Sequence, residues 1–174
     1  VDRIESLQEN NPMLGHRGCR LGITKPEIYK MQTEAIFRSA IKLHQQGQEI
    51  KPEIMVPLIA DQKELEFIKN YLVQHIDQLF KQYDQEPFPY EIGTMIELPR
   101  ACLTADKLAE EADFFSFGTN DLTQMTYGFS RDDIGKFIGQ YKELEILPFD
   151  PFQMVDKEGV GELMKIAIRK ARQV

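Results

Sequence analysis

Residues 90–122 read YEIGTMIELPRACLTADKLAEEADFFSFGTNDL. Short apolar runs open and close this stretch, at 90–97 and 114–118, and Pro99 can start a helix between them. Runs that are apolar at successive positions are typical of strands buried on both faces, as in parallel sheets covered by helices. The stretch therefore predicts a strand, a helix and a second strand parallel to the first.

An earlier strand and helix precede this stretch. Residues 53–59 form another apolar run, and 61–64 open a helix with an apolar stripe at helical spacing, made of Leu65, Ile68, Leu72, Ile76, Leu79 and Tyr83. Residues 84–89 read as a linker. The order strand, helix, strand, helix, strand predicts the α/β class with parallel strands and flanking helices.

Helices are also expected near both ends. Residues 24–27, TKPE, resemble a capping box with proline in the first turn, followed by an apolar side of Ile28, Met31 and Ala35. A last helix is expected over roughly 159–172, with Val160, Leu163, Met164 and Ala167 on one side. This pattern fits an open sheet or a barrel, and both place their chemistry at the carboxyl ends of the strands.

Length and charge limit the function classes. A chain of 174 residues with 42% hydrophobic content can bury one sizeable core. A net charge of -7 argues against a nucleic-acid groove or an anionic membrane surface as partner. No apolar run approaches the ~20 residues of a membrane span. We expect a cytoplasmic protein whose two cysteines, Cys19 and Cys102, are packed, reduced thiols.

Two carboxylates stand at predicted strand ends. Glu97 closes the second strand and Asp121 follows the third. Neighbouring parallel strands would bring these ends near one another, and two carboxylates with water and substrate oxygens suit Mg²⁺. The alternative is that each carboxylate caps the helix that follows it. The residue pattern alone leaves both interpretations open.

Further polar groups suit an anionic ligand. Residues 118–121, GTND, form a compact turn with backbone N–H groups and an amide for phosphate or carboxylate oxygens. Arg17, Arg20 and Arg131 offer guanidinium groups for a phosphoryl group. Taken singly, each arginine could equally form a salt bridge at the surface.

Three motifs resemble the phosphoenolpyruvate-utilising enzyme family: NPMLGHRGCRL (11–21), IGTMIE (92–97) and FFSFGTNDLTQ (114–124). The first of them and YGFSRDDIGKF (127–137) resemble the dikinase branch of that family more than its synthase or phosphotransferase-system enzyme I branches. The resemblance covers almost the whole chain and implies a (β/α)8 TIM barrel. Since such a barrel needs about 250 residues, we expect residues 1–174 to be part of the phosphoenolpyruvate- and pyruvate-binding barrel domain, truncated at both ends.

The resemblance also implies a reaction, in which ATP, phosphate and pyruvate give AMP, diphosphate and phosphoenolpyruvate. It implies partners: pyruvate or phosphoenolpyruvate, a phosphohistidine domain of the same parent chain, and a second copy in a homodimer. By matching position, the Mg²⁺ ligands would be Glu97 and Asp121. The implied substrate-binding residues are Arg17, Glu97, Gly118, Thr119, Asn120, Asp121 and Arg131.

The resemblance places no catalytic residue within the chain. A general-acid cysteine is expected beyond Val174, and neither Cys19 nor Cys102 matches it, so we expect the fragment alone to be inactive. Arg100 has no matching role and serves as a reference arginine. The alternatives are a synthase or enzyme I barrel, or a non-catalytic dimerisation module.

Overall fold

The structure is a computed structural model and describes residues 12–174. Its strands β1 (Glu53–Val56), β2 (Glu91–Ile96) and β3 (Phe115–Phe117) form one sheet in the order β1-β2-β3. Strands β2 and β3 are parallel, with Thr94 opposite Phe115 and Ile96 opposite Phe117. The α/β class and the three strand positions are confirmed, with shorter strands than predicted. Three strands do not make a closed (β/α)8 barrel, so the barrel stays a prediction.

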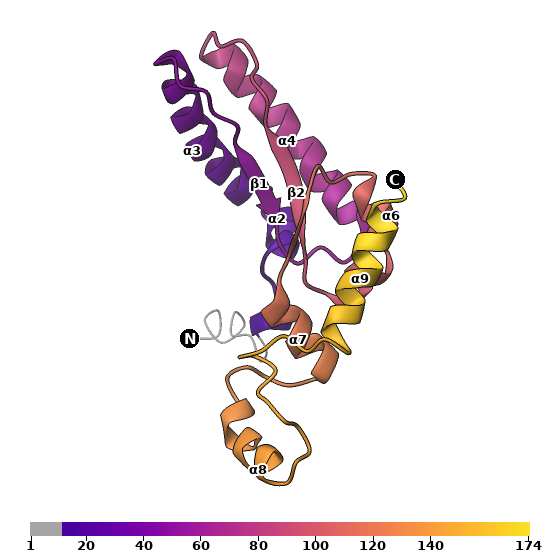
Figure 1. The fold of residues 1–174 in the computed structure, drawn as a ribbon. Helices are drawn as coiled ribbons and strands as arrows, with labels where there is room; N and C mark the ends of the chain where they lie inside the picture. Colours follow the sequence, from indigo (N-terminus) through magenta and orange to yellow (C-terminus); the bar gives the residue numbers. More distant parts are fainter. Residues whose placement is uncertain (1–11) are drawn as a thin grey trace, which may run out of the picture. The chain divides into compact units, whose positions relative to one another are not determined.

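Helices precede, connect and follow the strands (Figure 1). The α-helices are α2 (Cys19–Thr24), α3 (Pro26–Gln45), α4 (Gln62–Gln82), α5 (Pro99–Leu103), α6 (Ala105–Ala109), α7 (Thr119–Tyr127), α8 (Ile138–Glu143) and α9 (Val160–Ala171), and the 3-10 turns are η1 (Pro12–Leu14) and η2 (Ile134–Lys136). The described chain divides into two compact units. The first holds the described residues up to Ile54 with Glu66–Glu91, and the second holds Met55–Leu65 with Ile92–Val174.

An aromatic cluster around Phe37 forms the core of the first unit. The Phe37 ring meets Phe80 and Tyr90 edge-on, with centroids 5.8 and 5.2 Å apart, and stacks on Phe88 at 6.2 Å. This cluster decides which face of α3 is buried, namely Thr33, Phe37, Ala40 and Ile41. The apolar side predicted for α3 is therefore wrong, and Met31 is 63% exposed. The stripe predicted for α4 is confirmed, since all its members but the half-buried Tyr83 are buried.

The capping box predicted at Thr24 is also wrong. Thr24 ends α2, where its hydroxyl donates to the carbonyl of Arg20 over 3.0 Å. The residue that precedes α3 is Lys25, which makes no side-chain cap, while Pro26 occupies the first turn as predicted. The preceding helical turn thus competes for the hydroxyl that a cap would need.

Helix α9 packs against α5, α6 and α7 in the second unit. Its buried Val160 and Ala167 belong to the same core as Leu108. The helix predicted to start at Pro99 is confirmed but is interrupted at Thr104, whose hydroxyl donates to the carbonyl of Arg100 over 2.9 Å. The last helix is confirmed within one residue at each end.

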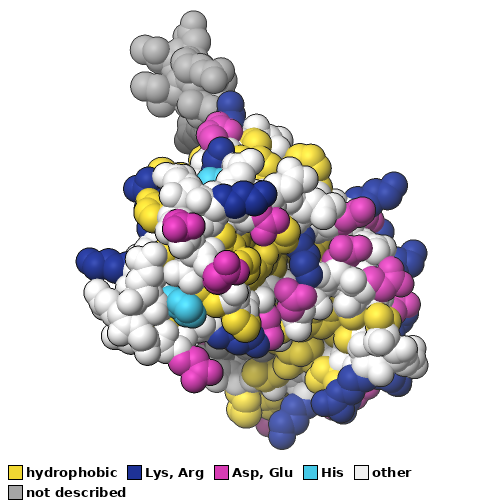
Figure 2. Space-filling model, turned by 90° about the horizontal axis from the view of Figure 1, so that it is seen from above, with side chains coloured by type: hydrophobic (Ala, Val, Ile, Leu, Met, Phe, Trp, Pro, Cys, Tyr) yellow, Lys and Arg dark blue, Asp and Glu magenta, His cyan; other side chains and the backbone are white. Residues whose placement is uncertain are grey.

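Both cysteines are buried in the described chain, as predicted for packed thiols. Burial raises the pKa of Cys102 to about 11, which keeps that thiol protonated at neutral pH. On the face drawn in Figure 2, basic and acidic side chains are interspersed with hydrophobic ones, so charge of one sign does not gather there. Over residues 12–174, no helix is long and apolar enough to cross a membrane.

Candidate functional site

Glu97 follows β2 directly and is 4% exposed. Its Oε1 accepts a hydrogen bond of 2.6 Å from the backbone N–H of Leu58, in the segment that follows β1. The residue that precedes α5 is Leu98, and no side chain caps that helix. The alternative interpretation of Glu97 as a helix cap is therefore wrong, because its carboxylate reaches across to the neighbouring strand end.

Gly118 lies beside Glu97 at the end of the neighbouring strand. Its backbone N–H donates to the carbonyl of Ile96 over 3.1 Å, which continues the pairing of β2 with β3. A Cβ on Gly118 would lie 2.7 Å from Cβ of Glu97, 2.8 Å from its Oε2 and 2.6 Å from Sδ of Met95. Only glycine leaves room for the Glu97 carboxylate against this turn.

The predicted polar turn is the start of a helix. Gly118 precedes α7, and Thr119, Asn120 and Asp121 make its first turn. The residue at the cap position is Gly118, so Asp121 does not cap α7 in the way the alternative interpretation required. The buried side chains of Leu122 and Thr123 anchor the helix. The first-turn N–H groups and Asp121 thus stand at the strand edge that carries Glu97.

The two arginines that the resemblance implies as substrate ligands, Arg17 and Arg131, lie in different units. Arg131 is exposed in the segment after α7, and its backbone N–H donates to Oε1 of Gln124 in that helix over 2.8 Å. This bond ties the segment that holds Arg131 to α7, the helix that begins at Thr119. Arg17 is exposed just before α2 in the first unit and stays a predicted substrate ligand.

The donor set at the strand ends fits Mg²⁺. That ion takes oxygen ligands, commonly one or two carboxylates with water and substrate oxygens at the remaining positions. Glu97 and Asp121 offer two carboxylates from neighbouring strand ends. Within residues 12–174, no three His, Cys, Asp or Glu side chains are grouped to hold a metal by themselves. A Mg²⁺ ion held by two carboxylates would have its remaining positions available to water and substrate oxygens.

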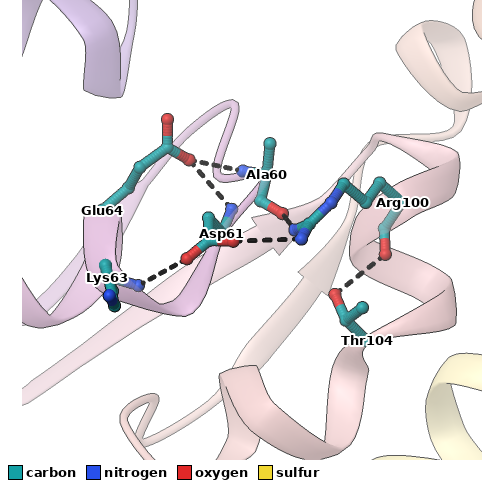
Figure 3. A network of polar contacts seen from close by, with 6 residues as sticks. All are labelled: Ala60, Asp61, Lys63, Glu64, Arg100 and Thr104. Carbon is teal, nitrogen blue, oxygen red and sulfur yellow. Dashed lines mark hydrogen bonds and ion pairs between the residues drawn. The ribbon is translucent and has the colours of Figure 1, made fainter.

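The sequence did not reveal the role of the segment after β1. Leu58 is buried and has a φ of 59°, in the left-handed region that a leucine seldom adopts. Arg100 donates to the carbonyl of Ala60 and pairs with Asp61 at 3.0 Å (Figure 3). Arg100 is therefore not a neutral reference arginine. Its place three residues after Glu97 was the one signal that could have pointed to this role.

The chain matches, over residues 1–174, the family described as PEP-utilising enzyme, PEP-binding domain, and it belongs to that family. It is 54% identical over 172 residues to a pyruvate, phosphate dikinase of Clostridium symbiosum, covering 98% of this chain and 20% of that protein.

Two plant relatives extend the comparison. The chain is 54% identical to pyruvate, phosphate dikinase 2 of Zea mays, over 98% of this chain and 19% of that protein. It is 52% identical to the chloroplastic pyruvate, phosphate dikinase 1 of Oryza sativa subsp. japonica, over 98% of this chain and 18% of that protein. The chain thus spans about one fifth of the length of these curated relatives. The resemblance found in the motifs is confirmed.

Proposed function

We propose that this chain binds phosphoenolpyruvate and pyruvate for phosphoryl transfer between a phosphohistidine and the enolate oxygen of pyruvate. The overall reaction would convert ATP, phosphate and pyruvate into AMP, diphosphate and phosphoenolpyruvate. One observation carries this proposal: Glu97 and the Gly118–Asp121 helix start stand together at the ends of parallel neighbours β2 and β3. The chain that carries these residues is 54% identical to a protein named pyruvate, phosphate dikinase.

Glu97 and Asp121 would hold Mg²⁺. The ion, when bound, supplies positive charge where negative charge develops on the enolate oxygen and on the moving phosphoryl group. The buried Leu58 N–H bond orients the Glu97 carboxylate before any ligand arrives. Such preorganisation favours charge stabilisation because the site does not reorganise during the reaction.

The remaining residues would bind the substrate. N–H groups of the first α7 turn and the Asn120 amide suit carboxylate or phosphoryl oxygens. By the family resemblance, the guanidinium groups of Arg131 and Arg17 would offer paired donors to phosphoryl oxygens. The proton that converts enolate to pyruvate would come from a cysteine outside this chain. The phosphohistidine domain would belong to the same protein, which we expect to be a cytoplasmic homodimer.

The test uses the complete protein with Glu97→Gln or Asp121→Asn. We expect each variant to lose pyruvate phosphorylation at ordinary Mg²⁺ concentration, because a neutral amide is a poor replacement for a carboxylate ligand. The nucleotide half-reaction should survive, since it would use another domain. Near wild-type pyruvate phosphorylation by both variants would disprove the metal assignment. Loss of both half-reactions would instead indicate misfolding.

A further inference from the structure

The segment after β1 and the segment after β2 contact each other at two points. At the first, the Leu58 N–H donates to Oε1 of Glu97 over 2.6 Å. At the second, Arg100 donates to the carbonyl of Ala60, and its Nη2 lies 3.0 Å from Oδ2 of Asp61 (Figure 3). Residues 58–61 are therefore held by both a carboxylate and a guanidinium that stand three residues apart.

The backbone at Leu58 is in an unfavourable conformation. Among the residues that the structure describes, three non-glycine residues have positive φ, and Leu58 is buried whereas Asp84 and Glu145 are exposed. A left-handed conformation costs free energy for a residue with a Cβ, so surrounding contacts must maintain it. The backbone N–H of Leu58, held in this conformation, donates the hydrogen bond that Glu97 accepts.

The start of α4 holds the same segment from its other side. Oε2 of Glu64 accepts from the N–H groups of Ala60 and Asp61, over 2.7 and 3.0 Å. Oδ1 of Asp61 accepts from the N–H of Lys63 over 3.1 Å (Figure 3). This N–H lowers the pKa of Asp61; burial acts in the opposite direction, and the positive charge of Arg100 lowers the pKa further. Asp61 is thus ionised and paired with Arg100 at neutral pH.

We propose that Arg100, acting through Ala60 and Asp61, is a positioning residue for Glu97. Arg100 fixes the Ala60 carbonyl, which holds the Leu58 N–H toward Glu97. With Oε1 engaged by Leu58, the side chain presents Oε2 toward the Gly118 turn. This inference rests on the proposed function, since it concerns the carboxylate assigned there to the metal. It adds a residue that touches neither cation nor substrate.

The test uses Mn²⁺, which is paramagnetic, in place of Mg²⁺. The electron paramagnetic resonance signal of free Mn²⁺ measures how much of the ion binds to the complete protein, with phosphoenolpyruvate present and nucleotide absent. The Glu97→Gln variant lacks the proposed ligand, so the Mn²⁺ that it still binds is bound at other sites. Loss of a partner that holds a metal ligand typically costs about 10–100-fold in affinity, and Arg100 acts one contact further out, so we expect Arg100→Gln to raise the dissociation constant of the Glu97-dependent site about tenfold. Arg100→Lys, which keeps the charge, should recover part of that affinity.

Arg38→Gln is the matched control. The Arg38 guanidinium pairs with Glu34 at 2.7 Å, and its side chain is 54% exposed against 56% for Arg100, but it lies in the first unit. Its loss should leave Mn²⁺ affinity unchanged. If Arg100→Gln binds Mn²⁺ like Arg38→Gln, the positioning role is wrong, even where its thermal stability is lower. If Glu97→Gln binds Mn²⁺ like the wild type, the metal assignment under the proposed function fails instead.

Discussion

Gly118 lies against Glu97 so closely that a Cβ on the glycine would come within 2.7 Å of Cβ of the glutamate. The contact joins the ends of two parallel strands, because the Gly118 N–H pairs with Ile96, the last residue of β2. The position of the buried Glu97 carboxylate thus depends on the absence of a side chain at residue 118, directly after β3.

Gly118→Ala should therefore displace the Glu97 carboxylate. We expect pyruvate phosphorylation by the complete protein to fall at least about tenfold and unfolding free energy to fall by about 1–3 kcal/mol, as for other overpacked sites. Steady-state kinetics and chemical denaturation measure the two effects. Gly139→Ala is the control, since a Cβ there meets nothing within 4 Å. Full activity in Gly118→Ala would contradict the assigned contact.

Arg131→Lys should lower turnover about tenfold or more without loss of folding, because lysine keeps the charge but loses the fork that binds two oxygens at once. The backbone bond from residue 131 to Gln124 does not depend on the side chain, so the segment should stay in place. Arg169, exposed on α9, replaces Arg100 as the reference arginine. Equal effects of Arg131→Lys and Arg169→Lys on kcat would remove the reason for singling out Arg131.

Neither cysteine should react with iodoacetamide at pH 8 in the native protein. Both thiols are buried, and the pKa of about 11 that burial gives Cys102 leaves almost no thiolate at this pH. Mass spectrometry after labelling, with and without urea, measures modification at Cys19 and Cys102. Both should be alkylated in urea, and rapid native labelling of Cys102 would show that its surroundings are more open than described.

His75 should make stability depend on pH. The side chain is buried between α4 and α3; burial lowers its pKa, and the charge of Lys30 lowers it further, whereas Glu34, 3.9 Å away, acts in the opposite direction. Below pH 6.5, the unfolded chain therefore binds a proton at His75 more readily than the folded chain does. The contribution of His75 is fully present above the ordinary pKa of 6.5 and is lost as pH falls below it.

The measurement is chemical denaturation of the expressed chain between pH 7.5 and 5.0. His75→Gln should remove part of the pH slope, which for one proton is at most about 1.4 kcal/mol per pH unit. His16→Gln, at an exposed histidine of the first unit, serves as the control. A wild-type slope in His75→Gln would show that other groups cause the pH dependence.

The positions of Glu97 and residues 118–121 in the candidate site were predictable, because they lie at strand ends that local patterns mark. Glu97 follows the apolar run that forms β2, and residues 118–121 follow the apolar run that forms β3. What those residues contact was not predictable. The pattern could not separate a helix cap from a strand-end ligand at Glu97, because the deciding hydrogen bond comes from Leu58, 39 positions earlier.

The sequence by itself determined the α/β class, the three strands, the buried stripe of α4 and the family. Hydrophobic periodicity and contiguous motifs are local properties, which the order of residues expresses directly. Only the tertiary structure decided the buried face of α3, the left-handed backbone of Leu58 and the contact of Arg100 with the Ala60 carbonyl. The physical reason is that each depends on groups far along the chain: aromatic rings from beyond α3 select its face, and the strand ends meet only when the sheet has formed.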